Sequence, residues 1–467
     1  MKTHSFHNQL VAVFGMARSG LATARALLNS GARVIAWDDN PHSLINAQNI
    51  GISVVDFRTI QWSQVSALVL SPGVPLTGDK KHWCVKLANQ FHVEVIGDIE
   101  LFVRERRLAS CHSPFIAVTG TNGKSTTVAL IAHILNQKGC DVQLGGNIGN
   151  PVMNLKDFSS SRFYIIECSS YQIELTPTID PSIGVLLNIS ADHLDRHHNL
   201  ENYIAIKKKI VTQSQHAVLC LNDCFTRQIA SDLAKIRHSM TLISPHKILK
   251  QDLSVERSCM QFSSTSEVIV GLSKDQEEYP VQNTDAAIAV CVKLGLTIEE
   301  IKQSLSSFNG LIHRFQKIAQ LGQVIFINDS KATNIDSVRY ALMKTRSMIY
   351  WIAGGISKSN DFSALFPYLS KIAKAYFIGE SAEIFAHSLQ ERVNCEVSQT
   401  LDKAIESVVH DVYYAQVPSI VLFSPGCASF DQYIDFRERG FAFMSQVSKI
   451  KGIEMLINLD KEREFLW

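Results

Sequence analysis

The chain has 467 residues, of which 46% are hydrophobic and 19% are charged, and its formal net charge at pH 7 is +1. This length exceeds what one hydrophobic core supports, so we expect about two to four domains, and the near-neutral charge argues against a dedicated nucleic-acid-binding protein. Ten scattered cysteines without a CxxC pair, no signal-peptide pattern and no apolar run of bilayer length predict a soluble, cytoplasmic protein with no membrane span.

Residues 1–108 predict a Rossmann-like domain. A buried-type strand at 10–15 precedes a helix-like run, and a second strand ends in Asp38. This is a βαβ unit with an acidic end to its second strand, although alanine stands where the dinucleotide fingerprint has its middle glycine. A third strand at 67–70 runs into a Ser-Pro-Gly turn, and ligands of such sheets sit at the carboxyl ends of the strands. We expect a nucleotide-type ligand here; a purely structural domain is the alternative.

The stretch Ile116–Thr127, IAVTGTNGKSTT, predicts a phosphate-binding loop. An apolar strand ends in a glycine turn from Gly120 to Gly123, and a helix-like pattern follows. Backbone N–H groups of such a turn and the helix N-terminus bind phosphate oxygens, while Lys124 would reach the terminal phosphates and Ser125 a Mg²⁺. The strict motif has glycine where this chain has valine, and an ordinary turn before a helix is the alternative. Lys-Ser directly after the turn favours a nucleoside triphosphate site.

Two further strands of the central region end in polar residues. The strand at 163–166 leads to Glu167, a carboxylate that is well placed to bind Mg²⁺. The alternative is that Glu167 is a surface acid at the end of a strand. The strand at 183–187 leads to the segment 188–197, NISADHLDRH, which is dense in groups that handle metal and phosphate. A zinc site built from these histidines lacks a suitably spaced cysteine or acid to complete it.

Lys207 lies on a predicted helix with an apolar stripe. Tyr203, Ile206 and Ile210 mark that stripe, and Lys207 lies on it four residues after Tyr203. Its two lysine neighbours are expected on a solvated face. Burial would depress the pKa of Lys207 and leave a nucleophilic neutral amine.

The region after residue 310 predicts a further α/β domain with a parallel sheet. Strands are expected at 324–327, 348–353, 375–378 and 420–423, alternating with helices. Their carboxyl ends carry small and polar residues together with two lysines, which suits an anionic ligand. Upstream, the segment 282–285 is expected to cap a helix at 286–294, and the charged segment 104–114 is expected to be a linker. Hinges are expected near residues 108–113 and 308–313.

With these segments assembled, the chain resembles the Mur ligase family over essentially its whole length. The segments that carry the resemblance occur in the family's order: GTNGKST, ECSSYQIE, NISADHLDRH, GLIHRF, INDSKATN, GGISKS and SPGCASFDQY. GTNGKS is shared with folylpolyglutamate synthases, whereas INDSKATN with SPGCASFDQY points to the members that add D-glutamate. The resemblance implies a monomer of three domains, at 1–108 for the UDP substrate, 109–310 for ATP and 311–467 for the amino acid. The fold class expected is α/β, with a P-loop domain between two Rossmann-like domains.

The activity that the resemblance implies is ATP-dependent addition of D-glutamate to UDP-N-acetylmuramoyl-L-alanine, through an acyl phosphate, in peptidoglycan precursor synthesis. The catalytic residues would be Lys124, Glu167, His193, Lys207 and Lys331. ATP would contact Gly120, Thr121, Asn122, Gly123, Lys124, Ser125, Thr126, Asn283, Arg314 and Asp329. The UDP substrate would contact Arg18, Ser19, Asp38, Ser71, Pro72, Gly73, Asn147 and His193, and D-glutamate would contact Lys331, Thr333, Lys358, Ser429 and Phe436.

The cofactor expected from the resemblance is Mg²⁺ at two sites. Its ligands would be Ser125, Glu167, His193 and Lys207, the lysine as a carbamate formed with CO₂. One motif departs from the family: Asn283 matches the adenine-side pattern, but Gln282 and Ala286 replace its histidine and its second asparagine.

Three other interpretations remain open from the sequence. An NAD-dependent oxidoreductase would explain the N-terminal βαβ unit but would leave Lys124, His193 and Lys331 without a role. A nucleotide-gated switch would use the phosphate loop without ligase chemistry. A sister Mur ligase, or an amide ligase like folylpolyglutamate synthase, would share the ATP chemistry and differ in the substrates that it joins.

Overall fold

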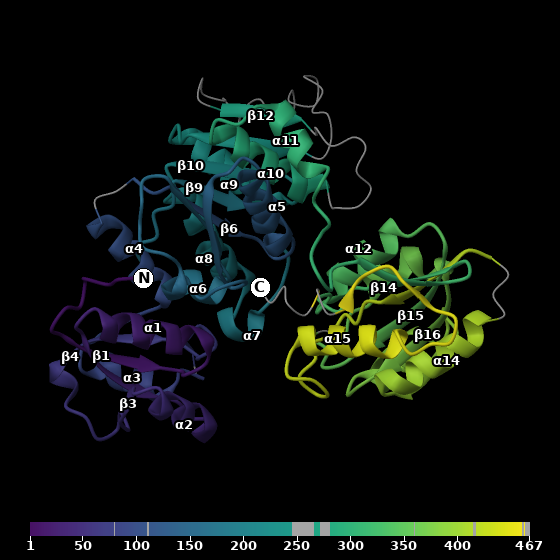
Figure 1. The fold of residues 1–467 in the computed structure, drawn as a ribbon, viewed down its shortest axis with the longest axis horizontal. Helices are drawn as coiled ribbons and strands as arrows, with labels where there is room; N and C mark the ends of the chain where they lie inside the picture. The colour runs from purple at the N-terminus through teal and green to yellow at the C-terminus, as the bar shows by residue number, and fades with distance from the viewer. Residues whose placement is uncertain are drawn as a thin grey trace. The chain divides into compact units, whose positions relative to one another are not determined.

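The computed structural model describes residues 1–78, 80–109, 112–244, 266–270, 281–358, 360–413, 417–459 and 462. The chain forms two compact units, Met1–Phe308 and Asn309–Leu466, which are coloured from purple to green and from green to yellow in Figure 1. The first unit contains two parallel sheets and the second contains one mixed sheet, so the expected α/β fold class is confirmed. The domain boundaries expected at residues 108 and 310 stay predictions.

The first sheet has five parallel strands in the order β3-β2-β1-β4-β5. Its strands are β1 (Leu10–Phe14), β2 (Arg33–Trp37), β3 (Ser53–Val54), β4 (Val65–Leu70) and β5 (Glu94–Ile96). The accompanying helices are α1 (Arg18–Asn29), α2 (Pro41–Asn49), α3 (Trp83–Gln90) and α4 (Asp98–Leu108). The central strands β1 and β4 are near-continuous apolar runs because both faces of a parallel sheet are covered. The Rossmann-like prediction for this part of the chain is confirmed.

The linker expected at 104–114 is wrong in its first half, because α4 continues to Leu108. Arg104 stabilises this helix by donating to Glu94 and, one turn back, to Glu100, at 2.8 Å each. Acidic side chains in the first turn and arginines in the last turn complement the helix dipole. High charge density here marks an ion-paired helix. Residues 110 and 111 of the expected hinge lie outside the described residues.

The second sheet has seven parallel strands in the order β12-β11-β10-β9-β6-β8-β7. Its strands are β6 (Phe115–Thr119), β7 (Asp141–Gly146), β8 (Arg162–Glu167), β9 (Ile183–Leu186), β10 (His216–Cys220), β11 (Met240–Ser244) and β12 (Ser266–Val270). The helices are α5 (Lys124–Gln137), α6 (Ser170–Glu174), α7 (Leu194–His197), α8 (Leu200–Thr212), α9 (Cys224–Lys235), α10 (Val281–Lys293) and α11 (Ile298–Leu305). Because β6 lies between β8 and β9, the loops that follow these three strands meet at one edge of the sheet.

The helix cap expected at 282–285 is also wrong, because α10 already includes Val281. Gln282 donates to the backbone carbonyl of Leu187 and accepts from Asn222. The side-chain amide of Gln282 is thus paired with the neighbouring loops from within the helix.

The second unit has a seven-stranded sheet in the order β17-β16-β15-β18-β14-β13-β19. Its strands are β13 (Gln316–Leu321), β14 (Val324–Asn328), β15 (Met348–Gly354), β16 (Ile372–Ile378), β17 (Cys395–Gln399), β18 (Ser419–Phe423) and β19 (Glu454–Met455). The helices are α12 (Ile335–Lys344), α13 (Ala382–Leu389), α14 (Leu401–Tyr413) and α15 (Phe436–Val447). The four expected strands are confirmed and pair in parallel, whereas β13 and β19 add an antiparallel edge that was not predicted.

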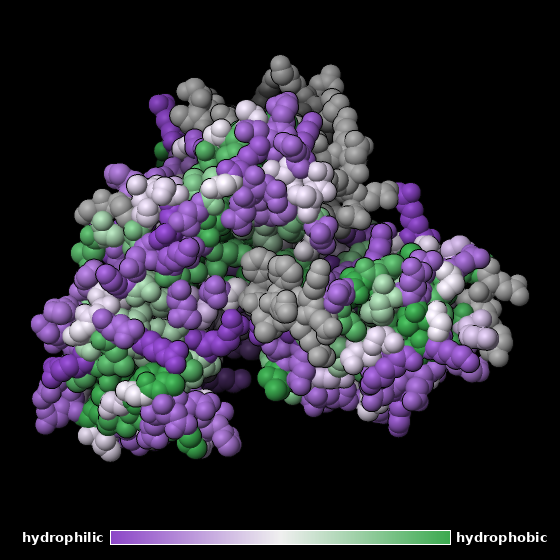
Figure 2. Space-filling view, viewed as in Figure 1, coloured by the Kyte–Doolittle hydropathy of each residue, from purple (hydrophilic) through white to green (hydrophobic). Residues whose placement is uncertain are grey.

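The visible face of the protein carries both hydrophilic and hydrophobic residues (Figure 2). Figure 2 shows hydrophilic residues over much of the visible face, with hydrophobic residues in patches between them. None of the helices in the described ranges is both long and apolar enough to cross a membrane.

Candidate active site

The phosphate loop connects β6 to α5 with the strand–loop–helix geometry expected of it. Gly123 lies at the N-cap of α5 with φ +87°, a left-handed conformation that disfavours other residues. A Cβ atom at Gly123 would lie 2.2 Å from Oδ1 of Asn283 on α10. Lys124 Nζ donates to the carbonyls of Gly120 and Thr121, at 2.9 Å each. The structure therefore brings the loop, its lysine and Asn283 together.

Lys207 reaches the same loop from α8. Its side chain is 1% exposed, and Nζ donates to the Gly120 carbonyl at 2.8 Å and to Thr119 Oγ1 at 3.2 Å. Burial, assisted by the nearby charge of Lys124, lowers the pKa of Lys207 well below its usual value. The expected inward orientation of Lys207 is confirmed, while its neighbour Lys208 is exposed.

Glu167 ends β8 next to the phosphate loop and is 1% exposed. Its Oε1 accepts from Asn147 Nδ2 at 2.7 Å. Its Oε2 is buried and has no hydrogen-bond partner among the described residues. An unpartnered buried carboxylate oxygen is costly unless a cation or a donor arrives. This side chain fits a metal ligand, and the alternative of a solvated surface acid is wrong.

His193 precedes α7 with a left-handed backbone at φ +55°. Its Nδ1 lies 2.8 Å from the Tyr171 hydroxyl, and its Nε2 lies 3.4 Å from Asp192 Oδ2. Within the described ranges, no group of three or more His, Cys, Asp and Glu side chains is arranged to hold a metal ion by itself. A cation at Glu167 and His193 would therefore need oxygen ligands from elsewhere, such as phosphate, water or a modified lysine.

Asp38 and Ser71, two of the residues expected on the UDP side, directly follow β2 and β4 at the carboxyl ends of these strands. Asp38 accepts from the backbone N–H groups of Met16 at 2.6 Å and Asn40 at 2.8 Å, so its carboxylate holds the first βα loop. Ser71 Oγ donates to the Gly15 carbonyl at 3.0 Å. Gly15 has φ +94°, and a Cβ atom there would lie 2.4 Å from Ser71 Oγ, which explains the glycine.

Four more of the UDP-side residues lie near the loop between β1 and α1: Arg18 and Ser19 at the start of α1, and Pro72 and Gly73 after β4. Arg18 Nη2 donates to the Gly149 carbonyl at 2.9 Å, which links α1 to the loop after β7. Ser19 follows in the same helix, and Pro72 and Gly73 form the turn after β4. A Cβ atom at Gly73 would meet nothing within 4 Å, so there is room beside this turn.

In the second unit, four of the five expected amino-acid residues lie on loops after neighbouring strands, and the fifth, Phe436, begins α15. Lys331 Nζ lies 4.0 Å from the centre of the Phe436 ring, a cation–π contact. The loops that carry Lys358 and Ser429 follow β15 and β18 and are joined by an isolated bridge between Ile356 and Ala428. Thr333 follows two residues after Lys331, before α12.

The two nucleotide residues expected in the second unit, Arg314 and Asp329, lie on the segments flanking the β13–β14 hairpin. Asp329 accepts from Phe315 N at 3.0 Å and from Ser424 Oγ at 2.8 Å. Burial raises the pKa of Asp329 to about 7. Its carboxyl group therefore holds loops within this unit, whatever further contact it makes.

The sequence analysis did not single out two residues that contact candidate site residues: Arg439 in the second unit, which is buried, and Tyr171 in the first unit, which is half-buried. Arg439 on α15 is 1% exposed and donates through Nη2 to the carbonyls of Ser330, at 2.8 Å, and Cys427, at 3.0 Å. It thus joins the loops that carry Lys331 and Ser429. Tyr171, on α6, contacts His193 through its hydroxyl. For Arg439, the sequence signal is a charged residue on the buried face of a helix with Phe443, Met444 and Val447.

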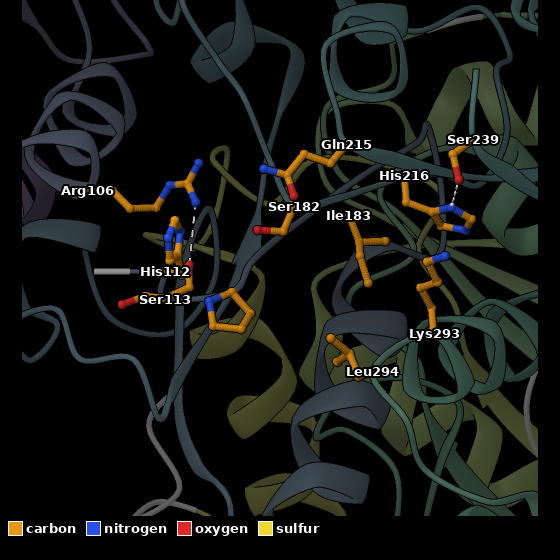
Figure 3. Close-up of a pocket in the computed structure, with 11 residues that line it drawn as sticks. Arg106, His112, Ser113, Ser182, Ile183, Gln215, His216, Ser239, Lys293 and Leu294 are labelled. Carbon is orange, nitrogen blue, oxygen red and sulfur yellow. Dashed lines mark hydrogen bonds between the residues drawn. The ribbon is translucent and has the colours of Figure 1, made fainter. Parts of the chain in front are cut away.

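A separate cavity of about 360 Å³ lies at the amino ends of β6, β9, β10 and β11, at the sheet edge opposite the phosphate loop. Figure 3 shows Arg106 and His112 on one side and His216 and Lys293 on the other. His216 bonds Ser239 Oγ at 2.8 Å, as the dashed line in Figure 3 marks. None of the predicted site residues lines this cavity.

Two protein-family models match this chain, one within each compact unit. Residues 118–291 match the Mur ligase middle domain, and residues 313–427 match the Mur ligase, glutamate ligase domain. The chain is 48% identical to UDP-N-acetylmuramoylalanine--D-glutamate ligase of Agrobacterium fabrum, covering 98% of both chains. It is 47% identical to the ligase of the same name from Rhizobium meliloti, covering 97% of this chain and 99% of that one.

Among solved structures, the fold is similar to UDP-N-acetylmuramate-alanine ligase MurC of Thermotoga maritima. The TM-score is 0.56 at 16% identity, covering 95% of this chain and 99% of that one. A likeness at that identity concerns the fold alone. The resemblance found in the sequence motifs is confirmed by the full-length relatives, and the chain belongs to the Mur ligase family.

Proposed function

We propose that this protein is an ATP-dependent ligase that joins D-glutamate to UDP-N-acetylmuramoyl-L-alanine and releases ADP and phosphate. The observation that carries the proposal is the near-complete alignment, at 48% identity, with a ligase named for this reaction. We place the reaction in the cytoplasm, in peptidoglycan precursor synthesis, with the protein as a monomer.

The chemistry explains why ATP is required. A carboxylate is a poor electrophile, so one of its oxygens attacks the γ-phosphorus of ATP, ADP departs, and an acyl phosphate forms. The amine of D-glutamate, after losing a proton, attacks the carbonyl carbon, and the tetrahedral intermediate collapses by expelling phosphate. Both steps gather negative charge, so catalysis depends on positioning and on cations.

The phosphate loop provides these elements for ATP. Its backbone N–H groups and the N-terminus of α5 would face the phosphates, and Lys124 would turn from the carbonyls it now contacts toward the terminal phosphates. Thr121, Asn122 and Thr126 belong to the same loop and helix start, and Asn283 packs against it. In the second unit, we assign Arg314 and Asp329 to the nucleotide.

Mg²⁺ fits the residues at this edge of the sheet. We assign Ser125 to one ion and Glu167 and His193 to a second, because the buried Oε2 of Glu167 has no partner within the described part of the chain. A bound Mg²⁺ would neutralise phosphate charge and orient the acceptor carboxylate. Histidine is an unusual Mg²⁺ ligand on grounds of hardness, so its assignment depends on the resemblance.

Lys207 would complete this second ion site as a carbamate. Its neutral amine attacks the carbon of CO₂, a C–N bond forms, and the proton leaves to solvent. The product carries anionic oxygens where Nζ now donates to the Gly120 carbonyl. The buried donor would thereby become an oxygen ligand, in addition to the one that Glu167 Oε2 would provide.

The substrates are assigned by loop. The UDP substrate is assigned to Arg18, Ser19, Asp38, Ser71, Pro72, Gly73, Asn147 and His193. D-Glutamate is assigned to Lys331, Thr333, Lys358, Ser429 and Phe436. The cation–π contact of Lys331 with Phe436 supports this second set, because it places a positive charge, which suits a carboxylate ligand, next to the ring of Phe436.

An amino-acid panel tests the proposal. Purified protein with UDP-N-acetylmuramoyl-L-alanine, ATP and Mg²⁺ should release phosphate with D-glutamate and form the expected amide product, detected by mass spectrometry. A higher rate with L-lysine, diaminopimelate or L-alanine would contradict it. Phosphate release with neither co-substrate would indicate a nucleotide switch, and a melting shift with NADH but not with ATP would favour the oxidoreductase.

A further inference from the structure

Arg196 on α7 links the two parallel sheets of the first unit. Its side chain is 8% exposed. Its Nη1 donates to the Val74 carbonyl at 2.6 Å, in the loop that follows β4. Its Nε and Nη2 donate to Glu174 Oε2, at 3.3 and 3.2 Å. One guanidinium thus contacts the N-terminal sheet and the end of α6.

Val74, whose carbonyl accepts from Arg196, is the last residue of the turn assigned to the UDP substrate. Val74 N donates to the Ser71 carbonyl at 3.0 Å, so Ser71, Pro72, Gly73 and Val74 form one turn. The same stretch meets α7 a second time: a Cβ atom at Gly78 would lie 2.1 Å from the His198 ring. Arg196 on α7 therefore bonds this stretch, and His198, just beyond α7, lies against Gly78.

Arg196 also contacts the group that orients His193. Its guanidinium carbon lies 5.3 Å from the centre of the Tyr171 ring. Tyr171 in turn bonds His193 Nδ1 at 2.8 Å through its hydroxyl. The network therefore runs from the turn, through Arg196 and Tyr171, to the imidazole assigned to the second metal ion.

The pairing with Glu174 neutralises the buried charge of Arg196, and that pair alone would not require a contact with the other sheet. The bond to a main-chain carbonyl 122 residues away needs the loop after β4 in one position. The fork geometry of arginine permits both contacts at once, whereas lysine carries a single nitrogen.

We propose that Arg196 is a positioning residue that holds the substrate turn and His193 in one arrangement, so that the UDP substrate binds with its acceptor carboxylate directed to His193. This inference rests on the function proposed above. Arg196 itself is not assigned to contact substrate.

The test compares Arg196→Ala and Arg196→Lys with wild type in steady-state kinetics. For Arg196→Ala we expect KM for UDP-N-acetylmuramoyl-L-alanine to rise about tenfold or more, as for loss of a hydrogen bond to a charged group. KM for ATP and D-glutamate should stay within about twofold of wild type. Arg196→Lys keeps the charge, so its KM for UDP-N-acetylmuramoyl-L-alanine should lie between those of wild type and Arg196→Ala.

Arg162→Ala is the matched control, because Arg162 also pairs with a carboxylate, Asp141, at 2.8 Å, at the start of β8. It should lower the melting temperature and leave every KM unchanged. Tyr171→Phe keeps the ring and removes the hydroxyl, so it should lower kcat more than it raises KM.

A folded Arg196→Ala protein with wild-type KM for the UDP substrate would overturn the inference, as would an equal KM rise in Arg162→Ala. If Arg196→Ala does not fold, a wild-type KM in Arg196→Lys overturns it in the same way. Calorimetry with the UDP substrate alone separates the two proposals: weakened binding in the Arg196 variants supports the inference even where wild type forms no product with D-glutamate.

Discussion

At the scale of single residues, Lys207 is where sequence and structure agree most closely. The helical stripe predicted an inward-facing lysine, and the structure places its amine on the phosphate-loop carbonyl of Gly120. Desolvation and the neighbouring Lys124 lower its pKa, which favours the neutral, nucleophilic form of the amine. Its neighbour Lys208 has the same side chain, but that side chain is exposed to solvent.

Lys207→Ala should therefore lose most ligase activity, about 100-fold or more in kcat, the range for removing a preorganised group at a reacting centre. The ATP-induced rise in melting temperature should persist, because the loop and Lys124 are intact. Lys208→Ala is the control and should behave as wild type. Turnover near normal in Lys207→Ala would rule out the carbamate role.

At the scale of elements, α5 carries a left-handed glycine at each end. Gly123 at the start has φ +87°, and Gly139, beyond the last turn, has φ +72°. A Cβ atom at Gly123 would meet Asn283, whereas one at Gly139 would meet nothing within 4 Å. The two positions share backbone strain and differ in what surrounds them.

Gly139→Ala should cost about 1–2 kcal/mol of unfolding free energy, the left-handed penalty for an L-residue, and leave KM for ATP unchanged. Gly123→Ala should carry the same penalty and also displace the loop or Asn283, raising KM for ATP about tenfold or more. Denaturant melts and ATP titrations measure both. Equal KM values for the two variants would show that the Asn283 contact has no bearing on nucleotide binding.

At the scale of the whole molecule, each unit has its own hydrophobic core. Two clusters, around Trp351 and around Phe443, lie wholly in the second unit, and the others lie wholly in the first. The candidate residues divide in the same way, with the phosphate loop and metal-side residues in the first unit and the D-glutamate residues in the second. We infer that ligation requires both units, whereas folding does not.

Expressed separately, residues 1–308 and 309–467 should each melt cooperatively, because each buries its own core. ATP with Mg²⁺ should raise the melting temperature of 1–308, and neither piece should make product. Calorimetry and phosphate release measure this. Product formation by 1–308 alone would contradict the assignment of the D-glutamate site, and a non-cooperative melt of either piece would contradict its independence.

The sequence by itself determined the strand–loop–helix at Ile116–Thr127, at least three of the parallel strands in each of the three sheets and the burial of Lys207, because glycine turns and apolar periodicity act between near neighbours. It misjudged the charged start of 104–114, where ion pairs hold a helix, and the segment 282–285, which lies inside α10. Only the tertiary structure decided that one oxygen of Glu167 has no hydrogen-bond partner among the residues that the structure describes, and that Arg196 meets a carbonyl 122 residues away. Such contacts depend on which strand ends become neighbours, and local spacing does not carry that information.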